Sequence, residues 1–257
     1  MFIILSATGD AGSSPAAVTI MEKFNKEEFC VKVISTDDVL EWVLYKHYAH
    51  RKPPISYAFG LFHRDELVAV CTFGRPCFMT LIKNAFQGEY QDCFFELNRL
   101  CANDGLPRNA LSFFVGKCLV MLPKPMVIVS YADSGQNHHG YIYQATNWIY
   151  TGTSVPFKDY MVKGYEGMHS ASIMDMVGRS DKKGHLEKAR LLKEKFGEEN
   201  VYMVERSIKH RYFYLLGDKR EKRKMRRLLI YEEKPYPKGD NVRYDASYQP
   251  TLQGSLF

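Results

Sequence analysis

The stretch PMVIVSYADSGQNHHGYIYQATNWIYTGTS, residues 125–154, decides the fold class. Its first part, residues 125–132, is an apolar run rich in β-branched side chains, which predicts a buried strand. Residues 148–154 predict a second strand, and the segment between them, residues 137–147, predicts a helix. A strand, a helix and a further strand in succession are typical of an α/β sheet with parallel pairing.

The preceding residues extend this pattern toward the N-terminus. They predict a strand at 30–35, a helix at 36–49, a hairpin at 56–76, a strand at 93–102 and a helix at 108–122. In the hairpin, two apolar runs flank the polar turn HRDE, which favours antiparallel pairing. In the helix predicted at 108–122, apolar residues recur along one face. We therefore expect a mixed α/β sheet, antiparallel in its first half and parallel in its second.

Composition changes suggest three parts of the chain. Residues 1–20 are small and patternless, and we expect them to be a non-native or disordered extension. Residues 21–217 carry the strand and helix patterns and are predicted to form the catalytic domain. A strand at 157–164 and a helix at 185–197 complete that domain, although the pattern is weaker there. Residues 218–257 are predicted to be a basic segment followed by a flexible tail.

The chain is predicted to be a soluble, cytoplasmic protein. Its 257 residues are 46% hydrophobic, enough to bury a sizeable core. No apolar run approaches the roughly 18 residues that cross a bilayer, so no membrane partner is expected. The N-terminal MFIIL is too short, and lacks the flanking residues, to be a secretory signal.

Positive charge is concentrated near the C-terminus. The chain has a net charge of +6, and most of the excess lies in DKREKRKMRR, residues 218–227. Such a cluster suits a polyanion, because each neutralised phosphate releases counterions. A solvated helix face explains the same charges equally well.

The predicted order of elements resembles the Gcn5-related N-acetyltransferase fold, with a basic C-terminal extension. In that family, the loop and helix after one central strand hold the pyrophosphate of coenzyme A, and residues 96–114, ELNRLCANDGLPRNALSFF, stand in that place. The usual glycine-rich signature is reduced to Gly105. The resemblance implies acetyl-CoA as cofactor, bound by Arg99, Asn109, Ser112 and Tyr143.

A narrower resemblance is to the bacteriophage Mom family, DNA modification enzymes with this acetyltransferase-like core. The segments that carry it, in chain order, are KHYAHRKPP, YAFGLF, ELNRLC, PRNALSFF, SYADSGQNHHGYIYQATNWIYTG and KHRYFY. The resemblance implies an enzyme that converts adenine in double-stranded DNA to a methylcarbamoyl-type adenine in the bacterial host cell. The modification would protect phage DNA from restriction.

The same resemblance implies a catalytic and metal-binding set of His47, Tyr48, Asp133 and Tyr143. Members of the family are understood to use iron, and these nitrogen and oxygen ligands suit iron better than zinc. Two alternatives stay open. His47 and Asp133 are also placed to cap helices, and Tyr143 is also placed to protonate a departing coenzyme A thiolate.

Several other candidates have structural alternatives. Arg99 is expected to pair with a phosphate or carboxylate, or with Glu96 or Asp104 inside the fold. Asn109 has a plain N-cap as its alternative. The residues predicted to contact DNA are Lys209, Arg211, Tyr212, Arg220, Arg223 and Lys224. Among these, Tyr212 is expected to stack on a displaced base, with core packing as the alternative.

Two other functions remain compatible with the sequence. One is an ordinary acetyl-CoA-dependent acetyltransferase that acts on a small amine or a protein. The other is a DNA-binding protein of the same fold without catalysis. The first requires neither DNA nor metal, and the second predicts salt-sensitive DNA binding without turnover.

Overall fold

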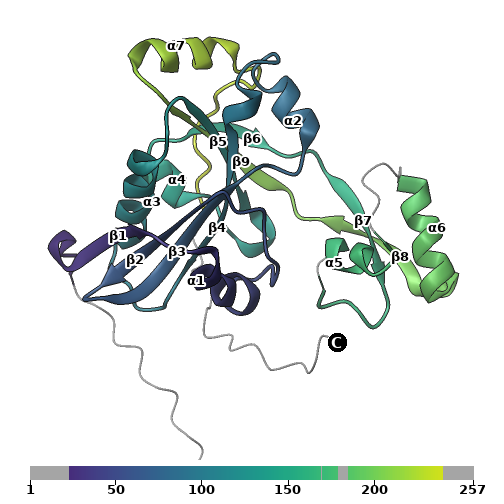
Figure 1. The fold of residues 1–257 in the computed structure, drawn as a ribbon. Helices are drawn as coiled ribbons and strands as arrows, with labels where there is room; N and C mark the ends of the chain where they lie inside the picture. Colours follow the sequence, from purple (N-terminus) through teal and green to yellow (C-terminus); the bar gives the residue numbers. More distant parts are fainter. Residues whose placement is uncertain (1–22, 169, 179–184, 240–257) are drawn as a thin grey trace, which may run out of the picture.

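A computed structural model describes residues 23–239, apart from residue 169 and residues 179–184 (Figure 1). The elements are β1 (Phe29–Val33), α1 (Thr36–Glu41), the π-helix η2 (Trp42–Lys46), β2 (Tyr57–His63), β3 (Glu66–Gly74), α2 (Met79–Asn84), β4 (Phe94–Ala102), α3 (Ala110–Met121), β5 (Met126–Asp133), α4 (Tyr141–Ala145), β6 (Ile149–Thr153), β7 (Phe157–Val162), α5 (Ser170–Asp175), α6 (His185–Phe196), β8 (Val201–Arg206), β9 (Lys209–Leu216) and α7 (Lys219–Leu228). The predicted extension, residues 1–20, and the end of the tail lie outside the described residues. No helix in the described part of the chain is long and apolar enough to span a bilayer.

Seven strands form the large sheet, in the order β1-β2-β3-β4-β5-β9-β6. Neighbouring strands in this sheet are antiparallel, except for β4 and β5, which are parallel. The mixed α/β sheet is therefore confirmed, and so is the order of elements through β6. The parallel part is smaller than expected, because β9 comes from much later in the chain and inserts between β5 and β6.

Helices cover both faces of this sheet. Alternate residues of a strand point to opposite faces, and β5 supplies apolar residues to both. Ile128 packs in the cluster that contains Phe114 of α3. Val129 packs in the cluster that contains Ile82 of α2 and Met225 of α7. The helices α3 and α4 therefore lie on one face, and α2 and α7 lie on the other.

A small lobe is inserted between β6 and β9. The strands β7 and β8 pair in a separate two-stranded sheet, which packs with α5 and α6 at one side of the molecule (Figure 1). Its core is distinct from those of the large sheet and contains Val162, Ile173 and Leu192. An ion pair of 3.1 Å between Arg51 and Asp175 joins the lobe to the segment that follows η2.

The segment after α7 packs against the large sheet as far as residue 239. The backbone N–H of Lys234 donates to the carbonyl of Tyr150 at 2.8 Å. The hydroxyl of Tyr236 donates to the carbonyl of Trp148 at 2.6 Å. The predicted boundary at residue 218 therefore separates segments that pack together, since residues 230–239 run along β6 toward α4.

Candidate functional site

The two parallel strands β4 and β5 separate partway along their length. They pair only through Phe94–Glu96 and Val127–Val129, whereas β4 continues to Ala102 and β5 to Asp133. The opening between residues 97–102 and 130–133, with Glu96 at its edge, is called the β4–β5 gap below. Ligands of open α/β sheets bind beyond the carboxyl ends of parallel strands. The gap is therefore the place in this sheet where a ligand site is expected.

His47 lies near this gap at the end of η2. Its backbone N–H closes the π-turn by donating to the carbonyl of Trp42 at 2.9 Å, and π-turns are frequent at functional sites. Its ring stacks on Tyr48 with 4.4 Å between the ring centroids. Burial lowers the pKa of His47 to about 3, and the positive charge of Arg99 lowers it further. The imidazole is therefore neutral at physiological pH.

Glu96 places a carboxyl group where the two strands begin to separate. Burial raises its pKa to about 7, while the charges of Arg99 and Lys209 act in the opposite direction. Within the described part of the chain, no hydrogen bond or ion pair holds this carboxyl group. An acid with a pKa near 7 and no fixed partner is suited to general acid–base chemistry.

Tyr143 reaches β5 from the other face of the sheet. Its hydroxyl lies 2.7 Å from the hydroxyl of Ser130, which is also 2.8 Å from the carbonyl of Leu97 across the start of the gap. Burial raises the pKa of Tyr143 well above its ordinary value. The phenol is therefore protonated at neutral pH and remains available as a proton donor.

Asp133, the last residue of β5, is held by three partners. One carboxylate oxygen accepts hydrogen bonds from the backbone N–H of Gly135, at 2.9 Å, and from the hydroxyl of Ser207. The other lies 3.5 Å from the ammonium group of Lys209, and the side chain is only 12% exposed. Since Ser207 lies between β8 and β9, Asp133 links the gap to the small lobe.

Three of the four predicted iron ligands are engaged with other groups of the protein. The ring nitrogen Nδ1 of His47 accepts the backbone N–H of Ala49 at 3.1 Å. The oxygens of Asp133 are occupied as described, and Tyr143 is bound to Ser130 from the opposite face of β5. No three His, Cys, Asp or Glu side chains among the described residues are placed to hold a metal. The described residues therefore show no metal site, and iron binding by these four residues stays a prediction of the resemblance.

Arg99 is a better candidate for holding an anionic ligand. It donates to the carbonyls of Asn98, at 2.6 Å, and of Arg51, at 3.2 Å. Its Nε–H is buried and has no partner among the described residues. The predicted alternative, an ion pair with Glu96 or Asp104, is not formed in the described part of the chain. An unsatisfied guanidinium donor can bind a phosphate or carboxylate oxygen.

The predicted pyrophosphate residues lie at the start of α3. Asn109 adopts a left-handed backbone conformation with φ of 77° and makes no side-chain cap. Ser112 donates its hydroxyl to the carbonyl of Asn109 at 3.0 Å. Asn109 is therefore the N-cap residue of α3 without a side-chain cap bond, and its exposed amide remains a candidate contact.

The predicted DNA contacts fall in three different environments. Lys209 lies at the gap beside Asp133. Arg211 is engaged inside the fold, since it donates to Thr151 at 2.9 Å and lies 3.6 Å from the centroid of the Tyr231 ring. Arg220, Arg223 and Lys224 are exposed on α7.

The expected stacking of Tyr212 on a displaced base is wrong. The side chain is fully buried, and its hydroxyl donates to the carbonyl of His139 at 2.5 Å. Its ring lies 5.2 Å from that of Tyr143. The alternative of core packing is correct, because Tyr212 belongs to β9, which lies inside the sheet between β5 and β6.

The prediction from sequence missed two residues of the gap. Glu96 was considered only as a partner for Arg99, and Ser130 only as the end of a strand. The available signal was the carboxyl group in the middle of the apolar strand FFELNRLCA, because a buried polar residue is more informative than an exposed apolar one.

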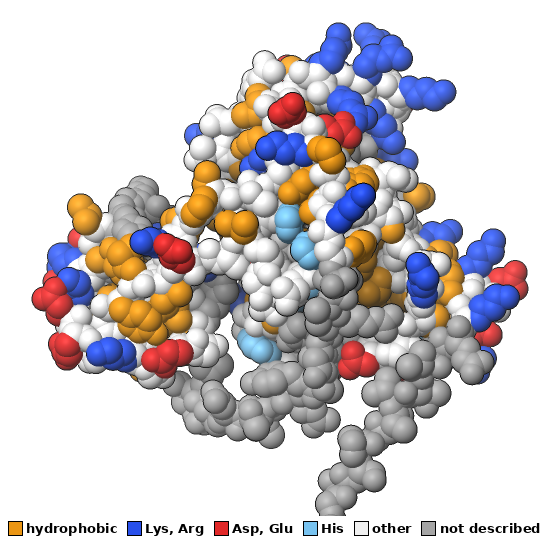
Figure 2. Space-filling model, turned by 180° about the vertical axis from the view of Figure 1, so that it is seen from behind, with side chains coloured by type: hydrophobic (Ala, Val, Ile, Leu, Met, Phe, Trp, Pro, Cys, Tyr) orange, Lys and Arg blue, Asp and Glu red, His pale blue; other side chains and the backbone are white. Residues whose placement is uncertain are grey.

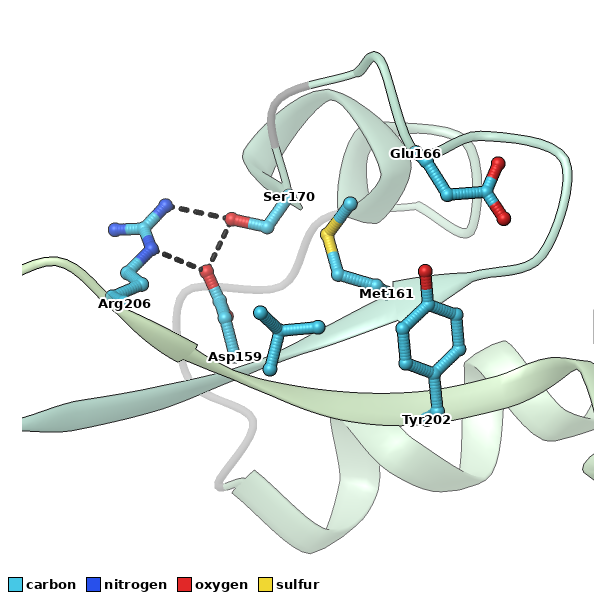
Figure 3. Close-up of a pocket in the computed structure, with 7 residues that line it drawn as sticks. Asp159, Met161, Glu166, Ser170, Tyr202 and Arg206 are labelled. Atoms are coloured by element: carbon cyan, nitrogen blue, oxygen red, sulfur yellow. Dashed lines mark hydrogen bonds and ion pairs between the residues drawn. The ribbon is translucent and has the colours of Figure 1, made fainter. Parts of the chain in front are cut away.

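A separate hollow of about 330 Å³ lies in the small lobe (Figure 3). Asp159 and Arg206 lie side by side at one edge of it and form an ion pair of 2.8 Å. The guanidinium of Arg206 also donates to the hydroxyl of Ser170 at 2.7 Å. Since these charges neutralise each other, we assign the network to holding α5 on the β7–β8 sheet.

The low pKa of His47 predicts how stability depends on pH. In the unfolded chain the imidazole gains a proton near its ordinary pKa of 6.5, whereas in the folded protein it does so at about 3. The free energy of unfolding therefore falls as the pH drops through this range, by about 1.4 kcal/mol per pKa unit. We expect His47→Gln to lose less stability on acidification than the unaltered protein. Urea unfolding at several pH values measures this, and equal losses in both proteins would contradict it.

Comparisons with known proteins identify the family that the segments quoted in the sequence analysis resemble. The model of the Mom protein family matches residues 28–238. The methylcarbamoylase mom of Escherichia phage Mu is 26% identical over 223 residues, which cover 84% of this chain and 86% of that protein. Two solved structures are also similar, each with 10% identity. An N-acetyltransferase from Staphylococcus aureus Mu50 has a TM-score of 0.40 and covers 74% of this chain and 99% of its own. An agmatine N-acetyltransferase has a TM-score of 0.37 and covers 73% and 100%.

Proposed function

Because this chain belongs to the Mom protein family, we propose that it is a DNA modification enzyme that converts adenine in double-stranded DNA to a methylcarbamoyl-type adenine. The observation that carries the proposal is the family match over residues 28–238, which includes every residue of the β4–β5 gap. The phage Mu relative is named a methylcarbamoylase. Protection of phage DNA from restriction in the bacterial cytoplasm is the biological role that follows.

Acetyl-CoA is the proposed group donor. Its pyrophosphate would lie near the start of α3, with the buried Nε–H of Arg99 available to an anionic oxygen. Its extended arm would enter the gap, where residues of β4 after Glu96 have no β5 partner. An acetyl group contains no nitrogen, so the amide nitrogen of a methylcarbamoyl group must come from a second donor, which displaces the coenzyme A thiolate. Joining the methyl carbon to the adenine nitrogen removes two electrons and two protons, so the reaction also requires a two-electron oxidant.

Glu96 is the proposed general base. The exocyclic amine of adenine must lose a proton when it forms a bond to carbon. The Glu96 carboxylate is placed in the gap to accept that proton, and its pKa of about 7 matches the working pH of such a base. Lys209 and Arg99, whose charges both lower this pKa, would keep a fraction of the group ionised.

Tyr143 and Ser130 are proposed to supply a proton to the leaving thiolate. When the Ser130 hydroxyl donates to the Tyr143 oxygen across their 2.7 Å contact, the phenol proton is free to point to a ligand. Burial keeps that proton on the phenol until a thiolate forms nearby. Tyr143 is therefore assigned the role of general acid. Its alternative role, metal binding, is not included in the proposal.

The adenine must leave the base stack to reach this site. An enzyme that acts on a base in a duplex turns the nucleotide out of the helix and holds its backbone on either side. Lys209, near the mouth of the gap, is the proposed contact for a phosphate next to that nucleotide. Arg211 and Tyr212 are not part of the proposal, because both are engaged inside the fold.

Mass spectrometry of nucleosides tests the proposal directly. Plasmid DNA would be isolated from cells that express the soluble protein and from cells that do not. A modified deoxyadenosine found only with the protein supports it. Unmodified DNA would refute it and leave either an acetyltransferase with another amine substrate or a DNA-binding protein without catalysis. Salt-sensitive DNA binding distinguishes the latter two.

The substitution Tyr143→Phe is expected to lower the level of modified deoxyadenosine on the order of tenfold to a hundredfold, at the low end for general acid catalysis because a thiolate leaves readily. The fold should persist, since Ser130 still bonds to Leu97 and a lost hydrogen bond costs about 1 kcal/mol. Tyr45→Phe, at an exposed tyrosine on η2, is the matched control. Full modification by the Tyr143→Phe protein would remove Tyr143 from the mechanism.

A further inference from the structure

The helix α7 is a fixed, strongly charged element. Asp218 caps its first turn, and Glu221 completes the capping box. Met225 is fully buried against the sheet and anchors the helix. Its ten residues contain seven basic side chains and one glutamate, a net charge of +6 that equals that of the whole chain.

Three arginines of this helix share one exposed stripe. Arg220, Arg223 and Arg227 are three and four residues apart and therefore follow one face of the helix. They line a hollow of about 600 Å³ beside the helix. Among the described residues no carboxylate forms an ion pair with any of the three, whereas neighbouring Lys224 and Arg226 do have such partners. Figure 2 shows basic side chains gathered at this end of the molecule.

This stripe lies far from the β4–β5 gap. The strand β9 pairs Lys209 with Asp133 at the gap and Leu216 with Met126 at its other end, where α7 begins. Seven strand residues span about 23 Å. Figure 1 accordingly shows α7 beyond one end of the large sheet and α1, which leads to His47, near the other.

We propose that the stripe Arg220–Arg223–Arg227 binds the phosphate backbone of the same DNA duplex about seven base pairs from the adenine held at the gap. The number follows from the separation of about 23 Å and the rise of about 3.4 Å per base pair. The inference rests on the proposed function. Arginine suits this contact because its planar fork matches phosphate oxygens and it stays charged at every working pH.

Two contacts at this separation predict a dependence on duplex length. A duplex with about four base pairs on each side of the adenine reaches the gap but not the stripe, whereas about twelve on each side reaches both. We expect the unaltered protein to bind the longer duplex at least tenfold more tightly. We expect Arg220→Gln/Arg223→Gln to lose that gain while binding the short duplex like the unaltered protein.

The matched control is Lys219→Gln/Lys222→Gln, which removes the same charge at the same spacing from the adjoining face of α7. Fluorescence anisotropy of labelled duplexes over a range of salt concentrations measures all three proteins. Loss of two phosphate contacts should reduce the salt slope on the long duplex by about two. Thermal unfolding like that of the unaltered protein would show that both variants fold.

The outcomes separate the inference from the proposed function. Loss of the length effect in the arginine variant alone supports the stripe. An equal loss in the lysine control, or a length effect that persists in the arginine variant, overturns it. If the unaltered protein binds long and short duplexes equally, the stripe is also overturned, although the proposed function stands. If the unaltered protein binds no duplex and modifies none, the proposed function itself fails.

Discussion

Replacing Glu96 by glutamine is expected to reduce the rate of adenine modification about a hundredfold or more, because the variant lacks the group that accepts the proton of the amine. In the unaltered protein the rate should rise with pH through the pKa of about 7, since the base acts only when ionised. The variant should have no such rise. Initial rates on a long duplex between about pH 6 and 8.5 measure both effects.

The same substitution should raise stability at alkaline pH. The folded-state pKa of about 7 lies above the ordinary value of 4.5, so the unfolded chain releases the proton first. The free energy of unfolding therefore falls as the pH rises from 4.5 to 7, by at most about 3 kcal/mol. Glutamine carries no charge and avoids this loss. Above pH 7 the variant should be more stable than the unaltered protein, and below 4.5 the two should be alike.

Opposite changes in activity and stability are the signature of a group retained for chemistry. Urea unfolding below pH 4.5 and above pH 7 compares the stability of the variant with that of the unaltered protein. Glu41→Gln, at an exposed carboxyl on α1, is the matched control and should change neither property. An active Glu96→Gln protein whose rate still rises through pH 7 would show that another group is the base.

The fold of the large sheet could be predicted because its strands carry their own signals. The predicted strand at 93–102 differs from β4 by one residue at its start, and the predicted strand at 125–132 differs from β5 by one residue at each end. What could not be predicted was the place of β9. The run at 202–216 contains two strands that belong to different sheets, and only Ser207 and Ile208 separate them. Periodicity within a segment does not indicate which sheet the segment joins.

The candidate site was predicted in part because polar residues at strand ends are visible in a sequence. His47, Tyr48 and Asp133 do lie around the gap, but their partners come from other elements, such as Ser207 for Asp133. Burial decided the remaining cases. Tyr212 has the aromatic ring of a stacking residue and Glu96 the carboxyl of a surface residue, yet the first is in the core and the second is shielded in the gap.

Asp133→Ala is expected to reduce both stability and activity. The carboxylate accepts bonds from Gly135 and Ser207 and faces Lys209, and it is largely buried. Removing it leaves these donors without their acceptor, which should cost about 2–4 kcal/mol of unfolding free energy. Lys209 would then be free to interact more strongly with Glu96, since its charge already lowers the pKa of that group.

A lower pKa of Glu96 should change the pH dependence of the rate as well as its magnitude. The base would be weaker, and the pH at which the rate rises should move below that of the unaltered protein. Asp133→Asn is the matched variant, because its amide oxygen can still accept the bond from Gly135 although the charge opposite Lys209 is gone. Both variants should therefore shift the pH profile, whereas the alanine variant should lose more stability. If the rates fall with an unchanged pH profile, Asp133 acts on the reaction without involving Glu96, as it would if it contacted the substrate itself.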